Sequence, residues 1–203
     1  MKIKLTKGEL KRQRDGLKQY ERYLPTLQLK KQQLQLEIMQ QYSFLDNRLK
    51  NLAAKKAALI TWAGLFSSGE EVLPGLLKIK KVLSAEKNVA GVNIPVFQSI
   101  DFEVTEYDLF LTPLWVDAAV EALKAVVSLR EETVLIQQGI AVLKAELRTT
   151  TQRVNLFEKV KIPEAAEAIR RIKIYIGDQM SNAVGRSKIA KNKIEENMLE
   201  VAV

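Results

Sequence analysis

The side chains that most enzymes use for nucleophilic catalysis or metal binding are missing from this chain. Its 203 residues include 32 Lys and Arg and 24 Asp and Glu, but neither His nor Cys. There is therefore no thiol or imidazole nucleophile, and no zinc site can be built from Cys or His. General acid–base catalysis would depend on Asp, Glu, Lys or Tyr, and no convergent set of these residues is visible. We predict no catalytic residue, no metal site and no cofactor.

The charged residues are unevenly distributed along the chain. Residues 1–62 have 14 basic and 5 acidic side chains, residues 63–113 have 4 and 7, and residues 114–203 have 14 and 12. The net charge is therefore +9 in the first segment, −3 in the second and +2 in the third, and +8 in all. A basic surface of this kind attracts acidic partners.

An apolar residue recurs at almost every seventh position of the first segment. Seven of the eight residues in this row are apolar: Leu10, Leu17, Leu24, Lys31, Ile38, Leu45, Leu52 and Leu59. A repeat of 3.5 residues over this length predicts a helix in a coiled coil. The companion row is half polar, which predicts an imperfect seam: Gln13, Tyr20, Leu27, Leu34, Gln41 and Arg48. Pro25 either begins a new helix at its first turn or kinks a continuous one.

The third segment has a similar helical repeat, which changes phase twice. The successive rows are Val116, Val120, Leu123, Val127, Arg130 and Val134; then Ile140, Leu143, Leu147, Thr150, Val154 and Phe157; then Ile162, Ala165, Ile169, Ile172 and Ile176. Such shifts move the apolar face around the helix, as stutters do in heptad patterns. Pro163 lacks a backbone donor and is a candidate kink. Asn155 is a candidate for fixing the coiled-coil register.

The middle segment, residues 63–113, has the features of a small β-containing lobe. Ser, Gly and Pro predict a loop at residues 67–75. Residues 78–84, 88–97 and 100–105 are rich in β-branched residues or alternate, and they predict two or three short strands with a turn near Glu86–Asn88. Pro95 suggests an edge strand. Trp62 and Trp115 flank the lobe, and we expect both in its core.

Two long helices separated by one compact insert must run antiparallel if they pair within the chain. We therefore predict a mainly α fold, with a long antiparallel two-helix coiled coil and a small middle lobe that contains a short β-hairpin. The predicted domains are an N-terminal coiled-coil helix (1–62), the middle lobe (63–113) and a C-terminal coiled-coil helix (114–203). Because the C-terminal arm is longer, part of residues 114–130 should pack on the lobe.

Three stretches carry more specific motifs. Residues 5–34 are basic and leucine-rich, and residues 89–97 read VAGVNIPVF. Residues 151–176 contain an Arg-Val-Asn…Glu…Ile-Pro run followed by an Ala-Ile-Arg-x-Ile helix. In their order and in their amino-acid sequences, these stretches resemble the D subunit of the V-type (vacuolar and archaeal-type) ATPases. The three matches together span most of the chain, and the last is the most specific.

This resemblance implies a non-catalytic central-stalk rotor protein, which transmits torque between an ATP-hydrolysing ring and a membrane ion-translocating ring. The implied partners are the catalytic and non-catalytic ring subunits, the small F subunit of the central stalk and an adaptor to the membrane ring. It would bind no nucleotide, and the sequence has no Gly-rich phosphate loop. Four basic residues are candidates to contact acidic loops of the ring: Lys7, Lys11, Arg12 and Arg14. Exposed ion pairs, worth about 0–1 kcal/mol each, can exchange as a shaft turns.

The implied location is cytoplasmic and peripheral to the membrane, without direct insertion. The apolar run Leu59–Phe66 is far shorter than the roughly 20 residues of a membrane-spanning helix. Residues 1–14 have no apolar core of signal-peptide length. Two other readings are a basic coiled-coil scaffold, which the heptads alone permit, and a nucleic-acid-binding module, which the net charge permits. Without a nucleic-acid motif or an aromatic platform, we expect no nucleic acid among the partners.

Overall fold

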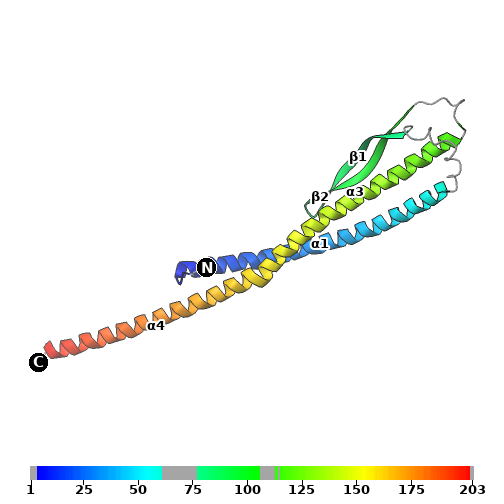
Figure 1. The fold of residues 1–203 in the computed structure, drawn as a ribbon. Coiled ribbons are helices and arrows are strands. Elements are labelled where there is room, and N and C mark those ends of the chain that lie inside the picture. Colours follow the sequence, from blue (N-terminus) through cyan, green and yellow to red (C-terminus); the bar gives the residue numbers. More distant parts are fainter. Residues whose placement is uncertain (1–3, 61–76, 106–112, 114, 202–203) are drawn as a thin grey trace. The chain divides into compact units, whose positions relative to one another are not determined.

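The computed structural model describes residues 4–60, 77–105, 113 and 115–201 (Figure 1). Its elements are α1 (Lys7–Ile60), β1 (Leu77–Val89), β2 (Val92–Val104), α3 (Trp115–Leu156), the π-helix η1 (Phe157–Lys161) and α4 (Ile162–Val201). The fold is mainly α with one β-hairpin, as predicted. Trp62 and the loop predicted at residues 67–75 lie outside the described residues. The two boundaries between the three predicted domains stay a prediction, because they fall in or beside segments that are not described.

The chain forms two compact units, which we describe separately. The terminal unit consists of residues 1–29 and 151–203, and the middle unit consists of residues 30–150.

Helix α1 runs without interruption through Pro25, so this proline does not begin a new helix, and a kink at Pro25 stays a prediction. The helix begins with a capping signal, because the backbone N–H of Glu9 donates to Thr6 Oγ1 at 3.3 Å. The predicted heptad rows form its least exposed face. Every residue of both rows is buried or half-buried, and the buried ones are Leu34, Ile38, Leu45 and Leu52. The predicted stripe is therefore confirmed.

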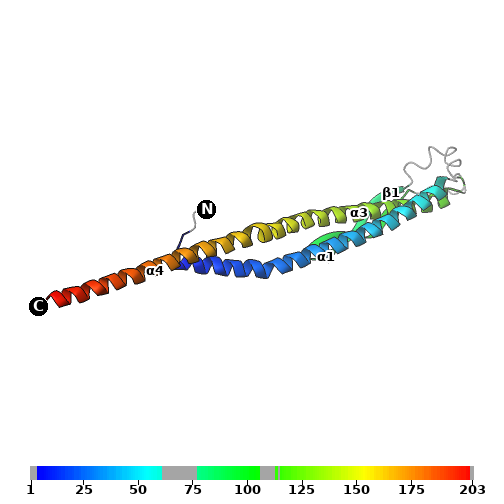
Figure 2. The same cartoon turned by 90° about the horizontal axis from the view of Figure 1, so that it is seen from below.

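Helices α1 and α3 run antiparallel in the middle unit (Figure 2). Lys30 Nζ lies 2.7 Å from Glu146 Oε1, and Arg48 Nε lies 3.0 Å from Glu132 Oε1. A later residue of α1 thus pairs with an earlier residue of α3, which is the geometry of a helical hairpin. These cross-helix pairs set the register, while the apolar rows provide the burial.

The β-hairpin differs from the prediction in the place of its turn. Strands β1 and β2 are antiparallel and pair from Leu77↔Val104 to Val89↔Val92. The turn is at Ala90 and Gly91, with φ of 50° and 80°. The predicted turn near Glu86–Asn88 was wrong, since these residues belong to β1. The second predicted stretch, residues 88–97, contains this turn, and its part from Val92 onwards forms one strand, β2, with residues 100–104 of the third stretch.

A two-residue hairpin turn with positive φ at both central residues explains this difference. Such a turn matches the twist of the strands, and glycine adopts it without steric cost. The side chain of Asn88 supports it, because Asn88 Oδ1 accepts a hydrogen bond from Gly91 N–H at 3.1 Å. Asn88 Nδ2 also donates to Asn93 Oδ1 at 2.6 Å across the hairpin.

The hairpin packs against both helices of the middle unit. Ile94 of β2 is buried with Leu34 and Ile38 of α1 and Leu143 of α3. Gly139 of α3 also lies beside Ile94, where a Cβ would make an ordinary contact of 3.7 Å with Ile94 Cβ. The sheet is therefore fixed to the helices by one shared apolar cluster.

A second cluster joins the start of α3 to the hairpin. Val116 and Val120 are buried, and Leu77 of β1 and Trp115 pack against them. Part of the segment 114–130 thus packs on the hairpin, as predicted, and Trp115 is half-buried against this cluster.

The first apolar row predicted for the third segment fails at its end. Arg130 is exposed and Val134 is 36% exposed, whereas Thr133 is only 4% exposed. Thr133 Oγ1 donates to the carbonyl of Arg130 at 2.6 Å, so its hydroxyl is satisfied in the core. The guanidinium of an arginine cannot satisfy all its donors on its own helix, and its burial without a partner would be costly. The first change of phase therefore comes before Thr133.

Thr150 provides a stability prediction. Its side chain is 1% exposed, and its hydroxyl has no hydrogen-bond partner among the described residues. Thr150→Val removes this hydroxyl and keeps the shape, so we expect the free energy of unfolding to rise by about 1 kcal/mol. Urea denaturation measures it. Thr149→Val is the matched control, because Thr149 Oγ1 is exposed and donates to Ala145 O at 3.1 Å. A gain of the same size in both variants would contradict the prediction.

Candidate partner-binding surfaces

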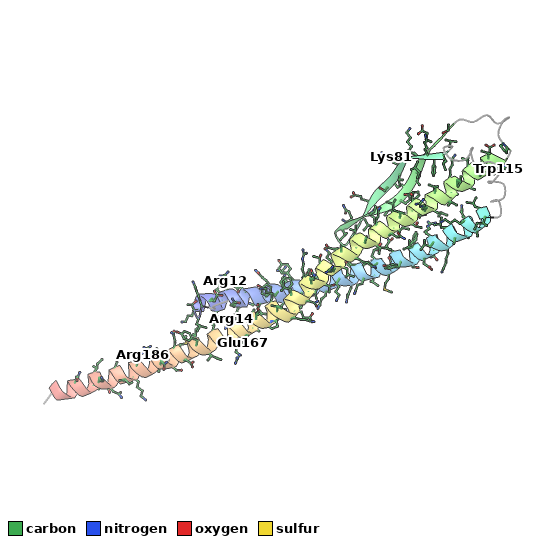
Figure 3. All side chains as sticks on the ribbon, viewed as in Figure 1. Arg12, Arg14, Lys81, Trp115, Glu167 and Arg186 are labelled. Carbon is green, nitrogen blue, oxygen red and sulfur yellow. The ribbon has the colours of Figure 1, made fainter. Side chains whose placement is uncertain are left out.

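The four predicted basic contact residues lie on the first turns of α1, in the terminal unit. Lys7, Lys11, Arg12 and Arg14 are all exposed, and Figure 3 labels the two arginines. None of the four forms an ion pair with a described residue. Glu9, which lies two residues from both Lys7 and Lys11, accepts a hydrogen bond from Gln13 Nε2 at 2.7 Å. The cations are thus available to an external partner.

This basic face is also hollowed. A groove of about 860 Å³ runs along it, and its lining includes Lys4, Lys11 and Arg12 together with Asp15 and Tyr20. Its walls are mixed in charge, which suits an acidic loop with a few polar or basic residues better than a bare phosphate.

The second half of α4 is the other unpartnered surface of the terminal unit. Every side chain in residues 177–195 is exposed. This segment extends past the N-terminal end of α1, and both views show no described helix beside it (Figures 1 and 2). Four large apolar residues are exposed there: Met180 (52%), Val184 (69%), Ile189 (60%) and Ile194 (55%). Three of them, Met180, Val184 and Ile194, share one helix face, so this face is a candidate for an interaction site.

Sequence reasoning missed this apolar surface. A signal was present, because Met180, Val184 and Ile194 lie on the helix face that continues from Ile172 and Ile176. Period alone does not tell whether such a row faces another part of the chain or a partner. Among the described residues, nothing covers the row.

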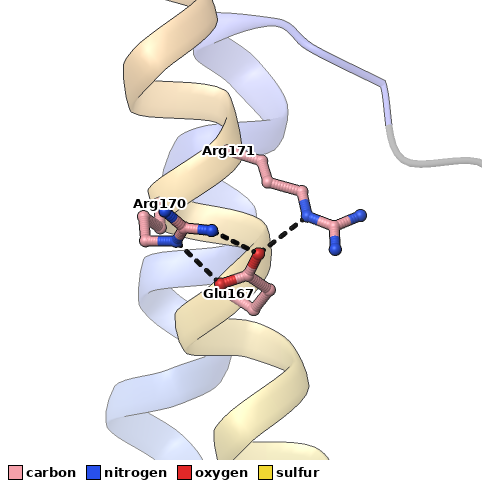
Figure 4. A network of polar contacts seen from close by, with 3 residues as sticks. All are labelled: Glu167, Arg170 and Arg171. Carbon is pink, nitrogen blue, oxygen red and sulfur yellow. Dashed lines mark hydrogen bonds and ion pairs between the residues drawn. The ribbon is translucent and has the colours of Figure 1, made fainter.

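The first half of α4 has a small network of ion pairs (Figure 4). Glu167 accepts hydrogen bonds from Arg170 Nε at 2.8 Å and Nη2 at 2.9 Å. Arg171 Nε donates to the same carboxylate at 2.8 Å. The hydrogen bonds from Arg170 and then Arg171 lower the pKa of Glu167 from its ordinary 4.5 to about 2. Both arginines are therefore oriented by their own helix.

This network leads us to predict how the thermal stability of the chain depends on pH. Because the pKa of Glu167 is lower in the folded chain, its contribution is complete above pH 4.5 and is lost as the pH falls towards 2. We expect Glu167→Gln to show a slightly shallower loss of thermal stability over this interval than the wild type, since exposed pairs contribute little. Melting curves at stepped pH measure it. An unchanged pH profile would mean that the network does not stabilise the fold.

The two other predicted residues lie near η1. Pro163 is the second residue of α4, directly after the π-helix. Asn155 is exposed on α3, beside the buried Val154. The register role of Asn155 and the kink at Pro163 stay predictions.

Two features are absent from the described residues. No three acidic side chains in this part of the chain lie close enough to hold a metal ion. None of the described helices combines the length and the apolarity needed to span a bilayer.

Comparison with known proteins gives a consistent result. The family model for the D subunit of ATP synthase matches residues 9–192. The V-type ATP synthase D subunit of Borreliella burgdorferi is 47% identical over 95% of both chains. The corresponding D subunits of Chlamydia abortus and Chlamydia caviae are 34% and 32% identical, each over 98% of this chain and 96% of its own length. With these matches over nearly its whole length, the chain belongs to the D-subunit family of ATP synthases.

Proposed function

We propose that this chain is the non-catalytic central-stalk rotor component of a V-type ATPase or ATP synthase. In this role it transmits torque between a ring of ATP-hydrolysing subunits and the ion-translocating ring in the membrane. The observation that carries the proposal is the terminal unit, where a basic helix start and an uncovered apolar helix belong to one unit. Membership of the D-subunit family supplies the assembly in which such a unit would be enclosed.

The two surfaces suit different parts of this task. The exposed apolar residues of α4 provide burial against an enclosing ring, at about 25 cal/mol per Å² of apolar surface. The four cations provide attraction to acidic loops through exposed pairs of about 0–1 kcal/mol each, which exchange at low cost. A shaft needs both, because it must be held in the ring and must still turn.

The middle unit suits the transmission of torque. Its two helices are joined by the pairs Lys30–Glu146 and Arg48–Glu132 and by the apolar cluster around Leu143. The hairpin is held to α1 as well, because Lys87 Nζ lies 3.1 Å from Glu37 Oε1. The hydrogen bond from Gln41, and next the contact with Lys87, lower the pKa of Glu37, so this carboxylate stays charged at neutral pH. Helices tied in this way twist together rather than separately.

The proposed partners are the catalytic and non-catalytic ring subunits, the small F subunit of the central stalk and the adaptor to the membrane ring. The chain would be cytoplasmic and peripheral to the membrane, with no direct insertion and no nucleic acid bound. Catalysis would belong to the ring alone.

Reversal of the four N-terminal cations tests the proposal. We expect the variant with Lys7→Glu, Lys11→Glu, Arg12→Glu and Arg14→Glu to bind the isolated ring about 10- to 100-fold more weakly, with most of the loss in the association rate. Binding of the chain to a surface-immobilised ring subcomplex, followed over a series of salt concentrations, measures the affinity and the association rate. The wild type should lose affinity as salt rises, and the variant should not.

A control variant with four other lysines changed to glutamate separates the effect of the position of the charges from the effect of the net charge. Lys55, Lys78, Lys80 and Lys81 are exposed in the middle unit, and their reversal should change ring affinity less than about 3-fold. Equal losses in both variants would point to a general charge effect. If the wild type did not bind the ring at all, or bound only nucleic acid, the rotor proposal would be wrong.

A further inference from the structure

The second change of phase in the apolar rows is a gap of one residue. Val154 and Phe157 end one row with a spacing of three, and the next row begins at Ile162 and continues at Ala165. A regular seam would place the residue after Phe157 four positions on, but Ile162 is five positions on. In an α-helix of 3.6 residues per turn, one extra residue rotates everything after it by about 100°. The row from Ile162 onwards would then turn away from its partner.

The structure absorbs this residue in η1. The backbone N–H of Ile162 donates to the carbonyl of Phe157, which is the i→i−5 bond of a π-helix. The wider turn takes up the extra residue, and the burial pattern remains continuous: Val154 is 4% exposed, Ala165 is 4% and Ile172 is 0%. Phe157 marks the start of the turn, with its ring centroid 5.4 Å from that of Tyr20.

Pro163 fixes where the wide turn ends. A residue with an N–H at this position would bond the carbonyl of Lys159 in an α-helix, but proline has no donor and its ring presses on that carbonyl. Lys159 lies inside η1. The last wide turn is therefore followed at once by a missing backbone bond, and the exposed side chains of Glu158 and Lys159 leave these turns open to water.

We propose that η1 with Pro163 is a twist joint, at which the helix takes up rotation about its own axis while the rows on both sides keep facing α1. The physical basis is that Pro163 donates no backbone hydrogen bond to this segment and that the segment has no buried residue of its own. Local opening is easiest where buried contacts are few and backbone bonds are exposed. Its use in a turning shaft rests on the proposed function.

Amide hydrogen exchange of the full chain tests the joint itself. In the wild type, the amides of residues 158–162 should exchange about tenfold or more faster than those of residues 165–172. Equal rates in the two segments would overturn the proposal.

A variant without the extra residue provides the comparison. Deletion of Lys159 together with Pro163→Ala brings Ile162 and Ala165 to spacings of four and three after Phe157, so one regular α-helix should form. Exchange in this segment should then fall to within about 2-fold of the flanking helix, and the thermal midpoint should not decrease. A large loss of stability would overturn the argument, since it would mean that the two rows are not one seam interrupted by one residue. Pro163→Ala alone keeps the extra residue and should keep the fast exchange.

The reconstituted complex tests the use of the joint. With the deletion variant, we expect normal assembly and about 3-fold slower ATP turnover, because a stiffer shaft transmits each step less smoothly. Normal assembly with unchanged turnover would overturn this use. If neither the variant nor the wild type assembled with ring subunits, the proposed function would fail while the exchange result still decided the joint.

Discussion

Leu143→Ala is expected to lower the free energy of unfolding by about 2–5 kcal/mol. Leu143 is completely buried and packs with Leu34, Ile38 and Ile94. It thus contacts α1 and β2 from α3, and its loss leaves a cavity where three elements meet. The cost combines the lost burial of the side chain with the cavity that remains.

Urea denaturation followed by circular dichroism measures this loss. The adjacent residue gives a matched control, because Val142 lies on the same helix and is 42% exposed. Val142→Ala should change the free energy of unfolding by less than about 0.5 kcal/mol. Similar losses for the two variants would show that the cluster around Leu143 is not the main core of the middle unit.

The second large effect is expected in binding rather than in folding. In the variant with Met180→Ser, Val184→Ser and Ile194→Ser, the affinity for the isolated ring should fall by at least about 100-fold. These side chains are 52%, 69% and 55% exposed, so the folded chain gains little from them. Burial of one such side chain by a partner is worth about 1.5–3 kcal/mol, and about 1.4 kcal/mol corresponds to a factor of ten. The thermal midpoint of the free chain should not change.

Ring binding by titration and melting of the free chain measure the two quantities. Asn182→Ser with Lys188→Ser is the control, since both residues are exposed on the same segment of α4. This control should bind within about 3-fold of the wild type. A triple variant that melted earlier would show that the apolar residues stabilise the chain itself. Normal affinity would exclude this segment from the ring interface.

The paired helices are the part of the fold that follows most directly from the sequence. A row such as Leu34, Ile38, Leu45 and Leu52 can be buried on one side only in a helix, because its spacing follows the helical period. The basic candidates of the site were also visible, since charge is a property of composition and long cationic side chains rarely become buried. The exposed positions of Lys7, Lys11 and Arg12 agree with this.

The sequence allows more than one local structure at the hairpin turn, at the buried face of α3 and at the end of α4, and the packing of the folded chain selects one. The turn at Ala90 and Gly91 was missed because the strand residues Glu86–Asn88 have turn-forming character of their own, and only the pairing of the two strands selects the register. Thr133 replaced Arg130 in the core because a hydroxyl can bond its own helix and a guanidinium cannot. The apolar row at Met180, Val184 and Ile194 is uncovered because the neighbouring helix ends.

The change of phase after Phe157 can be seen in the sequence, but its position in the helix follows from the folded structure. The spacing of the apolar residues shows that one residue is in excess between two regular rows. Only the folded chain decided where the excess is accommodated, since burial on both sides must be kept and Pro163 denies the next backbone bond. A π-turn satisfies both conditions at once, because it takes up a residue without rotating the buried face away from α1.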